Sequence, residues 1–191
     1  MMSASTPFFA SLADDHRFAD VAEQLIGGAV LPIAVDGNRH VDDTSWHADI
    51  QPGASYRAVK FCIYPDRLTG STGALRLVPG SNSGALHEQL EAANLRTTTE
   101  AGDTALGVPG SELPHFAFES EPGDVLVFNV SCFHAAFGGA PGRRQGVIVY
   151  YEDPQTPRAR KDIAEQMAGN HSVYSKHGVR ASAFMLTTTL L

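Results

Sequence analysis

The stretch Glu121-Pro-Gly-Asp-Val-Leu-Val-Phe128 joins a tight turn to a short apolar strand, and this combination decides the fold. Pro122 has a fixed φ angle and Gly123 tolerates a positive one, so the chain can reverse direction at this point. Residues 124–128 then supply the β-branched and aromatic side chains that are typical of a strand. A chain that repeats this pattern is expected to form an antiparallel sheet.

Four further segments have the same character, being brief, rich in β-branched and aromatic residues, and bounded by turn formers. They are residues 29–35, 58–64, 74–78 and 145–151. Proline and glycine in the separators 79–82 and 138–142 favour reversals between such strands. Many short strands with few helices indicate a β-sandwich or barrel. We therefore predict a mainly β fold of the jelly-roll, cupin-like kind with a few peripheral helices.

Helices are expected at the periphery of these strands. An apolar stripe recurs at helical spacing, after two aspartates and before a pair of glycines, and consists of Phe18, Val21, Ala22 and Leu25. Weaker patterns of the same kind predict short helices at residues 83–94 and 157–167. The sequence thus predicts helices before, within and after the strand region.

The bulk composition indicates one domain. A chain of 191 residues with 43% hydrophobic and 18% charged residues is long enough for one core. We expect a single domain over residues 1–191, with a helical N-terminal segment at 13–28 and a helical C-terminal tail at 157–191. The net charge of -7 argues against a nucleic-acid or anionic-membrane partner. The sequence leaves the oligomeric state open.

Cysteine use and hydropathy predict a cytoplasmic protein. Cys62 and Cys132, the two cysteines, lie far apart in the sequence and form no metal-type pair. No apolar run approaches the roughly 20 residues that span a bilayer. A reduced compartment and the absence of a membrane partner are therefore expected.

The candidate site begins with His47 and Asp49, which form a His-x-Asp tripeptide that chance can easily supply. On a strand these two side chains would point to the same face. His134 lies near the end of the apolar stretch 125–133, far enough along the chain for a strand to return across the sheet. Two imidazoles and one carboxylate can hold one face of a metal ion and leave the other open, as in non-heme iron(II) oxygenases.

An arginine follows this candidate triad. Arg144 comes after a glycine-rich turn and directly before the predicted strand 145–151. A fixed bidentate cation at this position can hold the far carboxylate of a dicarboxylic co-substrate that chelates the metal. Arg143 is the competitor for that role.

Four motifs stand in order along the chain. They are Trp46-His-Ala-Asp49, Gly73-Ala-Leu-Arg-Leu-Val-Pro-Gly-Ser-Asn82, Glu121–Phe128, and His134-Ala-Ala-Phe-Gly-Gly with Arg143-Arg144. Together they resemble the phytanoyl-CoA dioxygenase family over about Ala19 to Tyr151. The resemblance implies a double-stranded β-helix that uses Fe(II), 2-oxoglutarate as co-substrate, and O2. It also implies that His47, Asp49 and His134 are the metal ligands and that Arg144 holds the distal carboxylate of 2-oxoglutarate.

The resemblance also has departures. Family members usually carry His where this chain has Asn82, and usually have more sequence before the His-x-Asp strand. The ligand set is intact, and Asp49 bears on the reaction. Halogenases built on this fold replace the carboxylate with a small residue so that chloride can bind. The sequence therefore favours an Fe(II)/2-oxoglutarate-dependent hydroxylase that acts on an aliphatic C–H bond of a small-molecule substrate, releasing succinate and CO2.

Two further residues are candidate contacts for the co-substrate. Lys60 shares strand parity with Cys62 and either meets a carboxylate of 2-oxoglutarate or substrate, or lies on the solvent face. Asn38 either hydrogen-bonds 2-oxoglutarate or belongs to an ordinary turn in Asp36-Gly-Asn38. Trp46 is expected in the core or a pocket wall. The other histidines lack partners at ligand spacing and most are predicted at the surface: His16, His40, His87, His115, His171 and His177.

Two alternative functions remain open at this stage. A cupin-like isomerase or hydrolase could use the same jelly roll and a divalent metal without 2-oxoglutarate, although Arg144 argues against it. A non-catalytic member could keep the ligands and lack the substrate pocket.

Overall fold

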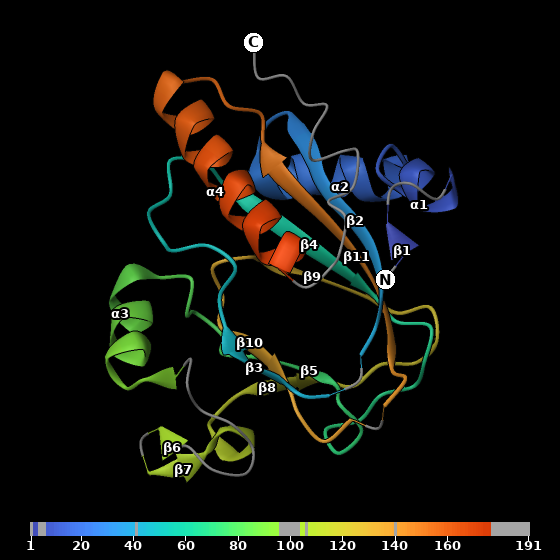
Figure 1. Cartoon of the computed structure of the whole chain (residues 1–191), viewed down its shortest axis with the longest axis vertical. Coiled ribbons are helices and arrows are strands. Elements are labelled where there is room, and N and C mark those ends of the chain that lie inside the picture. Colours follow the sequence, from blue (N-terminus) through green and yellow to red (C-terminus); the bar gives the residue numbers. More distant parts are fainter. Residues whose placement is uncertain are drawn as a thin grey trace. The chain divides into compact units, whose positions relative to one another are not determined.

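The computed structural model describes residues 2–3, 7–40, 42–95, 104–105, 107–139 and 141–176 (Figure 1). The chain divides into two compact units. The first comprises Met1–Asn38, Ala54–Cys62 and Gly146–Leu191, and the second Arg39–Gly53 and Ile63–Gln145. The single-domain organisation over 1–191 stays a prediction.

Sheet strands of the first unit follow the order β1-β2-β11-β4. Their bounds are β1 Met2–Ser3, β2 Val30–Arg39, β11 Arg144–Glu152 and β4 Ala58–Ile63. β1 pairs antiparallel with β2, and Met2 lies opposite Gly37. β4 and β11 coincide with predicted strands, whereas β2 continues four residues beyond the predicted segment 29–35.

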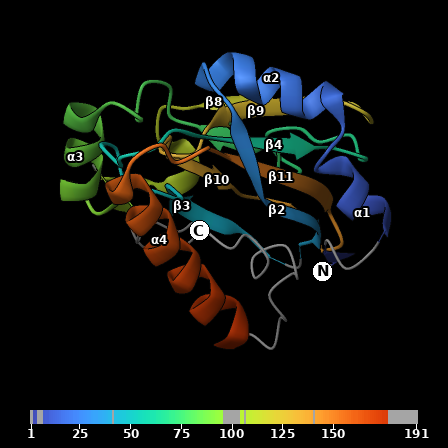
Figure 2. The same cartoon turned by 90° about the horizontal axis from the view of Figure 1, so that it is seen from above.

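Helices α1 (Pro7–Leu12) and α2 (His16–Ile26) lie along the strands of this unit (Figure 2). The Phe18 ring meets the Phe61 ring of β4 edge to face, with centroids 5.5 Å apart. The Phe61 ring in turn meets Tyr150 of β11, with centroids 5.8 Å apart. These aromatic contacts fix which face of the sheet α2 covers. The third helix of the unit is α4 (Pro157–Lys176), which extends well past the predicted end at residue 167.

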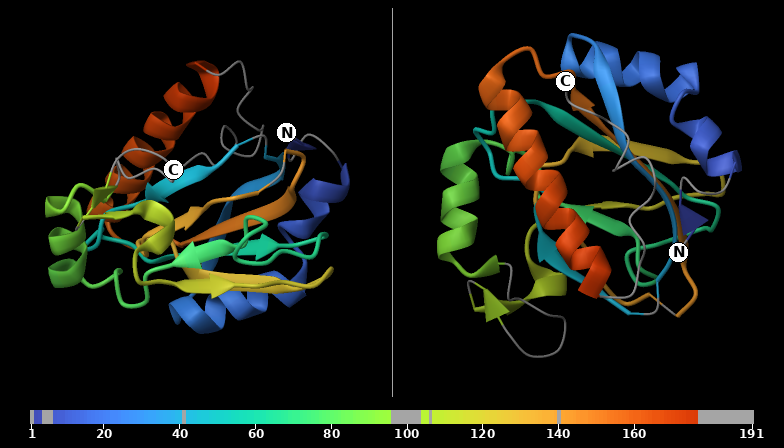
Figure 3. Two further views of the ribbon diagram at one scale, coloured as in Figure 1. Left: turned by 90° about the horizontal axis from the view of Figure 1, so that it is seen from below. Right: turned by 45° about the horizontal axis from the view of Figure 1, so that its top comes forward.

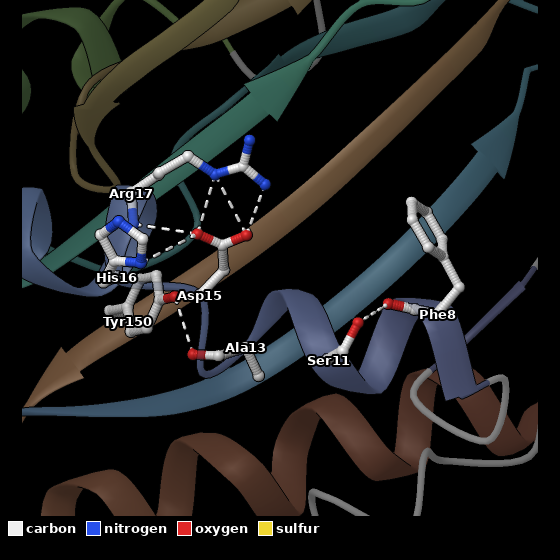
Figure 4. A network of polar contacts seen from close by, with 7 residues as sticks. All are labelled: Phe8, Ser11, Ala13, Asp15, His16, Arg17 and Tyr150. Carbon is white, nitrogen blue, oxygen red and sulfur yellow. Dashed lines mark hydrogen bonds and ion pairs between the residues drawn. The ribbon is translucent and has the colours of Figure 1, made fainter.

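Local sequence explains the start of α2, which Figure 4 shows, and its end. The Asp15 carboxylate accepts a hydrogen bond from the Arg17 backbone N–H at 3.0 Å, which caps the helix. Gly27 ends it with a left-handed φ of 79°. The predicted helix is confirmed, and Ala22 of the predicted stripe is buried, but Val21 and Leu25 are exposed and Ile26 is buried in addition.

The second unit is built on the antiparallel strand order β3-β10-β5-β8 (Figure 3). Their bounds are β3 Thr44–His47, β10 His134–Ala136, β5 Leu75–Leu77 and β8 Phe116–Phe118. β10 lies between its two partners, so His134 is opposite His47 on one side and Leu77 on the other. This register places two predicted ligands next to each other.

The remaining elements of the second unit are short. They are α3 Gly84–Ala92, β6 Thr104–Ala105, β7 Val108–Pro109, the 3-10 helix Gly110–Glu112 and β9 Val125–Asn129. A buried apolar cluster fills the unit: Trp46, Leu95, Leu113, Phe133, Ala135 and Phe137. The Trp46 indole N–H donates to the Gly110 carbonyl at 2.9 Å, so this tryptophan belongs to the core.

The mainly β prediction is therefore confirmed, because most of the described elements are strands and few are helices. Within the described ranges, no helix has the length and apolar character to cross a membrane.

Candidate metal centre

Three predicted ligands from the second unit meet at one point. The Nε2 atom of His47 lies 3.7 Å from one carboxylate oxygen of Asp49, and Nε2 of His134 lies 3.8 Å from the other. The two imidazole rings have centroids 4.1 Å apart. One ligand atom from each residue lies within 4.8 Å of the other two. The three side chains are thus close enough to hold one ion between them.

The backbone fixes which ring nitrogen of each histidine faces this point. Nδ1 of His47 lies 2.9 Å from the Ser45 carbonyl, and Nδ1 of His134 lies 3.0 Å from the Cys132 carbonyl. Because a carbonyl oxygen can only accept, each Nδ1 must carry the hydrogen. Each Nε2 is then left with its lone pair available to a metal. The donor set of two neutral imidazoles and one carboxylate fits Fe(II).

Burial makes the centre asymmetric. The His134 side chain is buried, with 3% of its surface exposed, whereas those of His47 and Asp49 are about one-third exposed. The edge of the Phe128 ring packs against His134, with centroids 4.9 Å apart. One ligand is therefore anchored in the core, while the other two border solvent, where a small molecule can approach.

Asp49 reaches the centre differently from the prediction. The sequence pattern treated His47 and Asp49 as alternate residues of one strand, but β3 ends at His47 and Asp49 lies in a bend. Its backbone N–H donates to the Val130 carbonyl at 3.0 Å, outside the β3–β10 ladder. The carboxylate is therefore placed by a loop contact and not by strand alternation.

Arg144 is already paired. Its backbone N–H and its guanidinium both donate to the Asp66 carboxylate, at distances of 2.5 to 3.2 Å. The pair raises the pKa of Arg144 and lowers the pKa of Asp66. Its side chain is 61% exposed. An arginine in this state has its charge neutralised by a neighbouring carboxylate.

Arg143 has the opposite environment. It is 8% exposed, and its Nη1 and Nη2 atoms are buried without a hydrogen-bond acceptor among the described residues. Burial lowers the pKa of the guanidinium, while Asp43 and Tyr64 act in the other direction. A buried cation whose hydrogen-bond donors are not satisfied is costly, so the guanidinium would be stabilised by an anion that accepts from Nη1 and Nη2.

Two glycines shape the space around the Arg143 guanidinium. A Cβ atom added at Gly73 would lie 1.8 Å from Nη1, and one added at Gly139 would lie 2.1 Å from it. Gly73 also has a φ of 92°, which favours glycine. Both positions therefore need glycine for Arg143 to occupy its place.

Lys60 and Asn38 belong to the first unit. Lys60 lies in the middle of β4 and Asn38 near the end of β2, and both are half-buried. The pKa of Asp36 is raised by burial, and the positive charge of Lys60 opposes that rise. Lys60 thus lies near a carboxylate of its own chain. Contacts of Lys60 and Asn38 with a co-substrate stay predictions.

The prediction that most other histidines lie at the surface holds for His16 and is wrong for His87. His87 is buried, because its ring packs on Phe133 with centroids 4.6 Å apart. His40 and His115 are partly buried and hydrogen-bonded. The side chains of the last two histidines, at positions 171 and 177, lie outside the described residues.

The comparisons with known proteins agree with the motifs. The family model for phytanoyl-CoA dioxygenase (PhyH) matches residues 2–145. The chain therefore belongs to the phytanoyl-CoA dioxygenase family, whose members are Fe(II)- and 2-oxoglutarate-dependent oxygenases. No curated protein matches the sequence.

Solved structures with the same fold are distant in sequence. AviO1 from Streptomyces viridochromogenes Tue57 is 20% identical, with a TM-score of 0.51 over 77% of this chain and 62% of that one. EctD from S. alaskensis is 23% identical, with a TM-score of 0.55 over 78% and 54%. The epimerase SnoN, crystallised with Fe3+, alpha ketoglutarate and nogalamycin RO, is 19% identical, with a TM-score of 0.55 over 79% and 62%.

These likenesses confirm the predicted double-stranded β-helix (jelly-roll) fold. EctD has also been crystallised with bound Fe, and with 2-oxoglutarate and 5-hydroxyectoine. The chain spans 54% to 62% of the length of the three proteins compared.

Proposed function

We propose that this chain is an Fe(II)- and 2-oxoglutarate-dependent oxygenase in which His47, Asp49 and His134 hold the metal. The observation that carries the proposal is the meeting of two Nε2 atoms and one carboxylate at a single point, with both imidazoles oriented by backbone carbonyls. Membership of the family supports the choice of iron and 2-oxoglutarate over other metals and co-substrates.

Within this proposal, the protein's residues act by binding and orientation. Fe(II) held by His47, Asp49 and His134 would supply open coordination positions for 2-oxoglutarate and O2, whose conversion to succinate and CO2 places one oxygen atom in the substrate. Asp49 contributes the negative charge of the ligand set. Partial exposure of His47 and Asp49 leaves the centre accessible from one side.

Arg143 is the stronger candidate for the distal carboxylate of 2-oxoglutarate, although the sequence favoured Arg144. A buried guanidinium whose Nη1 and Nη2 atoms have no acceptor among the described residues gains most from a carboxylate, because charge-assisted bidentate hydrogen bonds are strongest where water is excluded. Arg144 already has such a partner in Asp66, so binding a second carboxylate would require that pair to be broken or shared.

Hydroxylation of an aliphatic C–H bond in a small-molecule metabolite is the proposed outcome, because Asp49 leaves no ligand position for chloride. Epimerisation is the second candidate, because SnoN is described as a non-heme alpha ketoglutarate dependent epimerase. Both reactions begin with removal of a hydrogen atom from carbon, so the same metal site serves either.

A small-molecule substrate is consistent with the net charge of -7, which disfavours polyanionic partners. The cytoplasmic location also stays a prediction.

Succinate release tests the proposal. Protein loaded with Fe(II) under air and supplied with 2-oxoglutarate should release succinate slowly without substrate, and faster when a suitable substrate is added. His134→Ala should lose both activities, whereas His16→Ala, which changes an exposed histidine, should keep them. Fe(II)-dependent conversion of a substrate without succinate would instead indicate a cupin-like isomerase or hydrolase. Metal binding without any turnover would indicate a non-catalytic member.

A further inference from the structure

The turn between β5 and α3 holds the strand that carries His134. Ser81 is fully buried, and its hydroxyl donates to the Val78 carbonyl at 2.6 Å. The same oxygen accepts a hydrogen bond from the backbone N–H of Phe133 at 2.7 Å. The Phe133 carbonyl accepts from the Val78 N–H at 3.0 Å. Both backbone polar groups of Phe133 are thus tied to this one turn.

His87 of α3 also contacts this turn. Its Nδ1 atom lies 3.0 Å from the Ser81 carbonyl and therefore donates to it. The imidazole ring also packs against the Phe133 ring at an angle of 36°. His87 thus contacts both the serine and the residue that the serine holds. Substituting either residue should loosen the same backbone segment.

Glu91, one helical turn after His87, extends these contacts to the other ligand segment. Its carboxylate lies 3.4 Å from Nε2 of His87 and accepts a hydrogen bond from the Gln51 side chain, also at 3.4 Å. Gln51 is two residues beyond Asp49. Helix α3 therefore contacts both segments that lead to the metal ligands.

His134 needs such support because of its place in the sheet. It is the first residue of β10, and the pairing of β10 with β3 shifts register immediately after it. A register shift disrupts the hydrogen bonds between the two strands locally, so strand pairing alone fixes the position of His134 less firmly. The ring orientation also depends on the Cys132 carbonyl, on the other side of Phe133. The position of residues 132 and 133 thus decides where Nε2 of His134 points.

We propose that Ser81, supported by His87, is a positioning residue that sets the metal affinity of His134. The proposal rests on the metal site proposed above. The outer hydrogen bond of His134 is the one from Nδ1 to the Cys132 carbonyl, which Ser81 positions through Phe133, and loss of such a bond typically weakens metal affinity by about 10–100-fold.

Co(II) affinity, measured by calorimetric titration of the full chain, tests this role without any turnover. Ser81→Ala should raise the Kd for Co(II) by about 10–100-fold. Ser55→Ala is the matched control, because the Ser55 hydroxyl makes an equally short bond of 2.6 Å to Asp162 in the first unit. It should lower the melting temperature and leave the Kd unchanged.

A second variant keeps the test decisive if Ser81→Ala does not fold. His87→Phe retains a ring against Phe133 and removes the bond to the Ser81 carbonyl, so it should also raise the Kd. Wild-type Kd values in His87→Phe and in folded Ser81→Ala would overturn the positioning role. His134→Ala distinguishes the two proposals: if it binds Co(II) as tightly as wild type, the metal site itself is wrong.

Discussion

Replacement of Arg143 by Met separates the two arginines as anchors for 2-oxoglutarate. The change removes a buried guanidinium whose Nη1 and Nη2 atoms have no described acceptor, and it keeps an apolar stem of similar length. Because an unpaired buried charge destabilises the fold, the variant without co-substrate should be as stable as wild type or more stable. Arg144→Met, which breaks the exposed pair with Asp66, is the matched control.

The size of the expected rise in Tm follows from the linkage between co-substrate binding and the free energy of unfolding. Co-substrate at about 100 times its Kd stabilises the wild type by about 2.7 kcal/mol. For a protein of this size that corresponds to a rise in Tm of about 5–11 °C. Loss of the charge-assisted bonds, at about 1.5–3 kcal/mol, weakens binding by roughly 10–150-fold. The remaining stabilisation of Arg143→Met is then about 0.3–1.4 kcal/mol, or a rise of about 1–6 °C.

The assay is a thermal melt followed by circular dichroism, with Co(II)-loaded protein under nitrogen, with and without 2-oxoglutarate. Arg143→Met should lose most of the co-substrate-induced rise in Tm, and Arg144→Met should retain it. The reasoning is refuted if Arg144→Met loses the rise while Arg143→Met keeps the wild-type value.

Two further predictions concern the surroundings of these arginines. Gly73→Ala should weaken both 2-oxoglutarate binding and the stability of the fold, because the added Cβ atom would collide with Arg143. Gly123 has a similar positive φ angle and a Cβ atom added there would contact no other atom, so Gly123→Ala should lower stability alone. Calorimetric titration measures the change in binding, and thermal melting measures the change in stability. Arg144 lowers the pKa of Asp66, so the Asp66 carboxylate should stabilise the fold above pH 4 and lose this effect as the pH falls through its depressed pKa. The free energies of unfolding of Asp66→Asn and wild type, measured with urea, should therefore converge in acid. A constant difference between them down to pH 2 would contradict the pairing.

Much of the sheet structure follows from local sequence. The turn before β9 and the apolar runs of β4 and β11 carry their signals within a few residues, and the structure has strands there. β8 and β10 are harder to predict from the sequence, because strands of three residues are too short to show alternation and depend on their neighbours in the sheet. Helix α2 was predictable from its aspartate cap and closing glycine, whereas its buried face is set by contacts with the sheet.

The candidate site was predictable in its residue types and less so in its geometry. His47, Asp49 and His134 were identified from motif order, yet the loop that places Asp49 depends on a backbone contact with Val130 that no local pattern reveals. The supporting role of His87 was missed, although its spacing of four from Glu91 on a predicted helix was a usable signal.

The choice between Arg143 and Arg144 needed the burial of each side chain. Adjacent identical residues cannot be told apart by composition or motif spacing. The partner in Asp66 and the glycines beside Arg143 became visible only in the folded chain.

Anaerobic titration with Fe(II) and 2-oxoglutarate, followed by visible absorption, tests the central claim most directly. The account predicts a weak charge-transfer band for wild type that requires both additions and is absent in His134→Ala. A folded wild-type protein that gives no band, or a His134→Ala variant that gives the full band, would contradict the assignment of His47, Asp49 and His134 as the iron site.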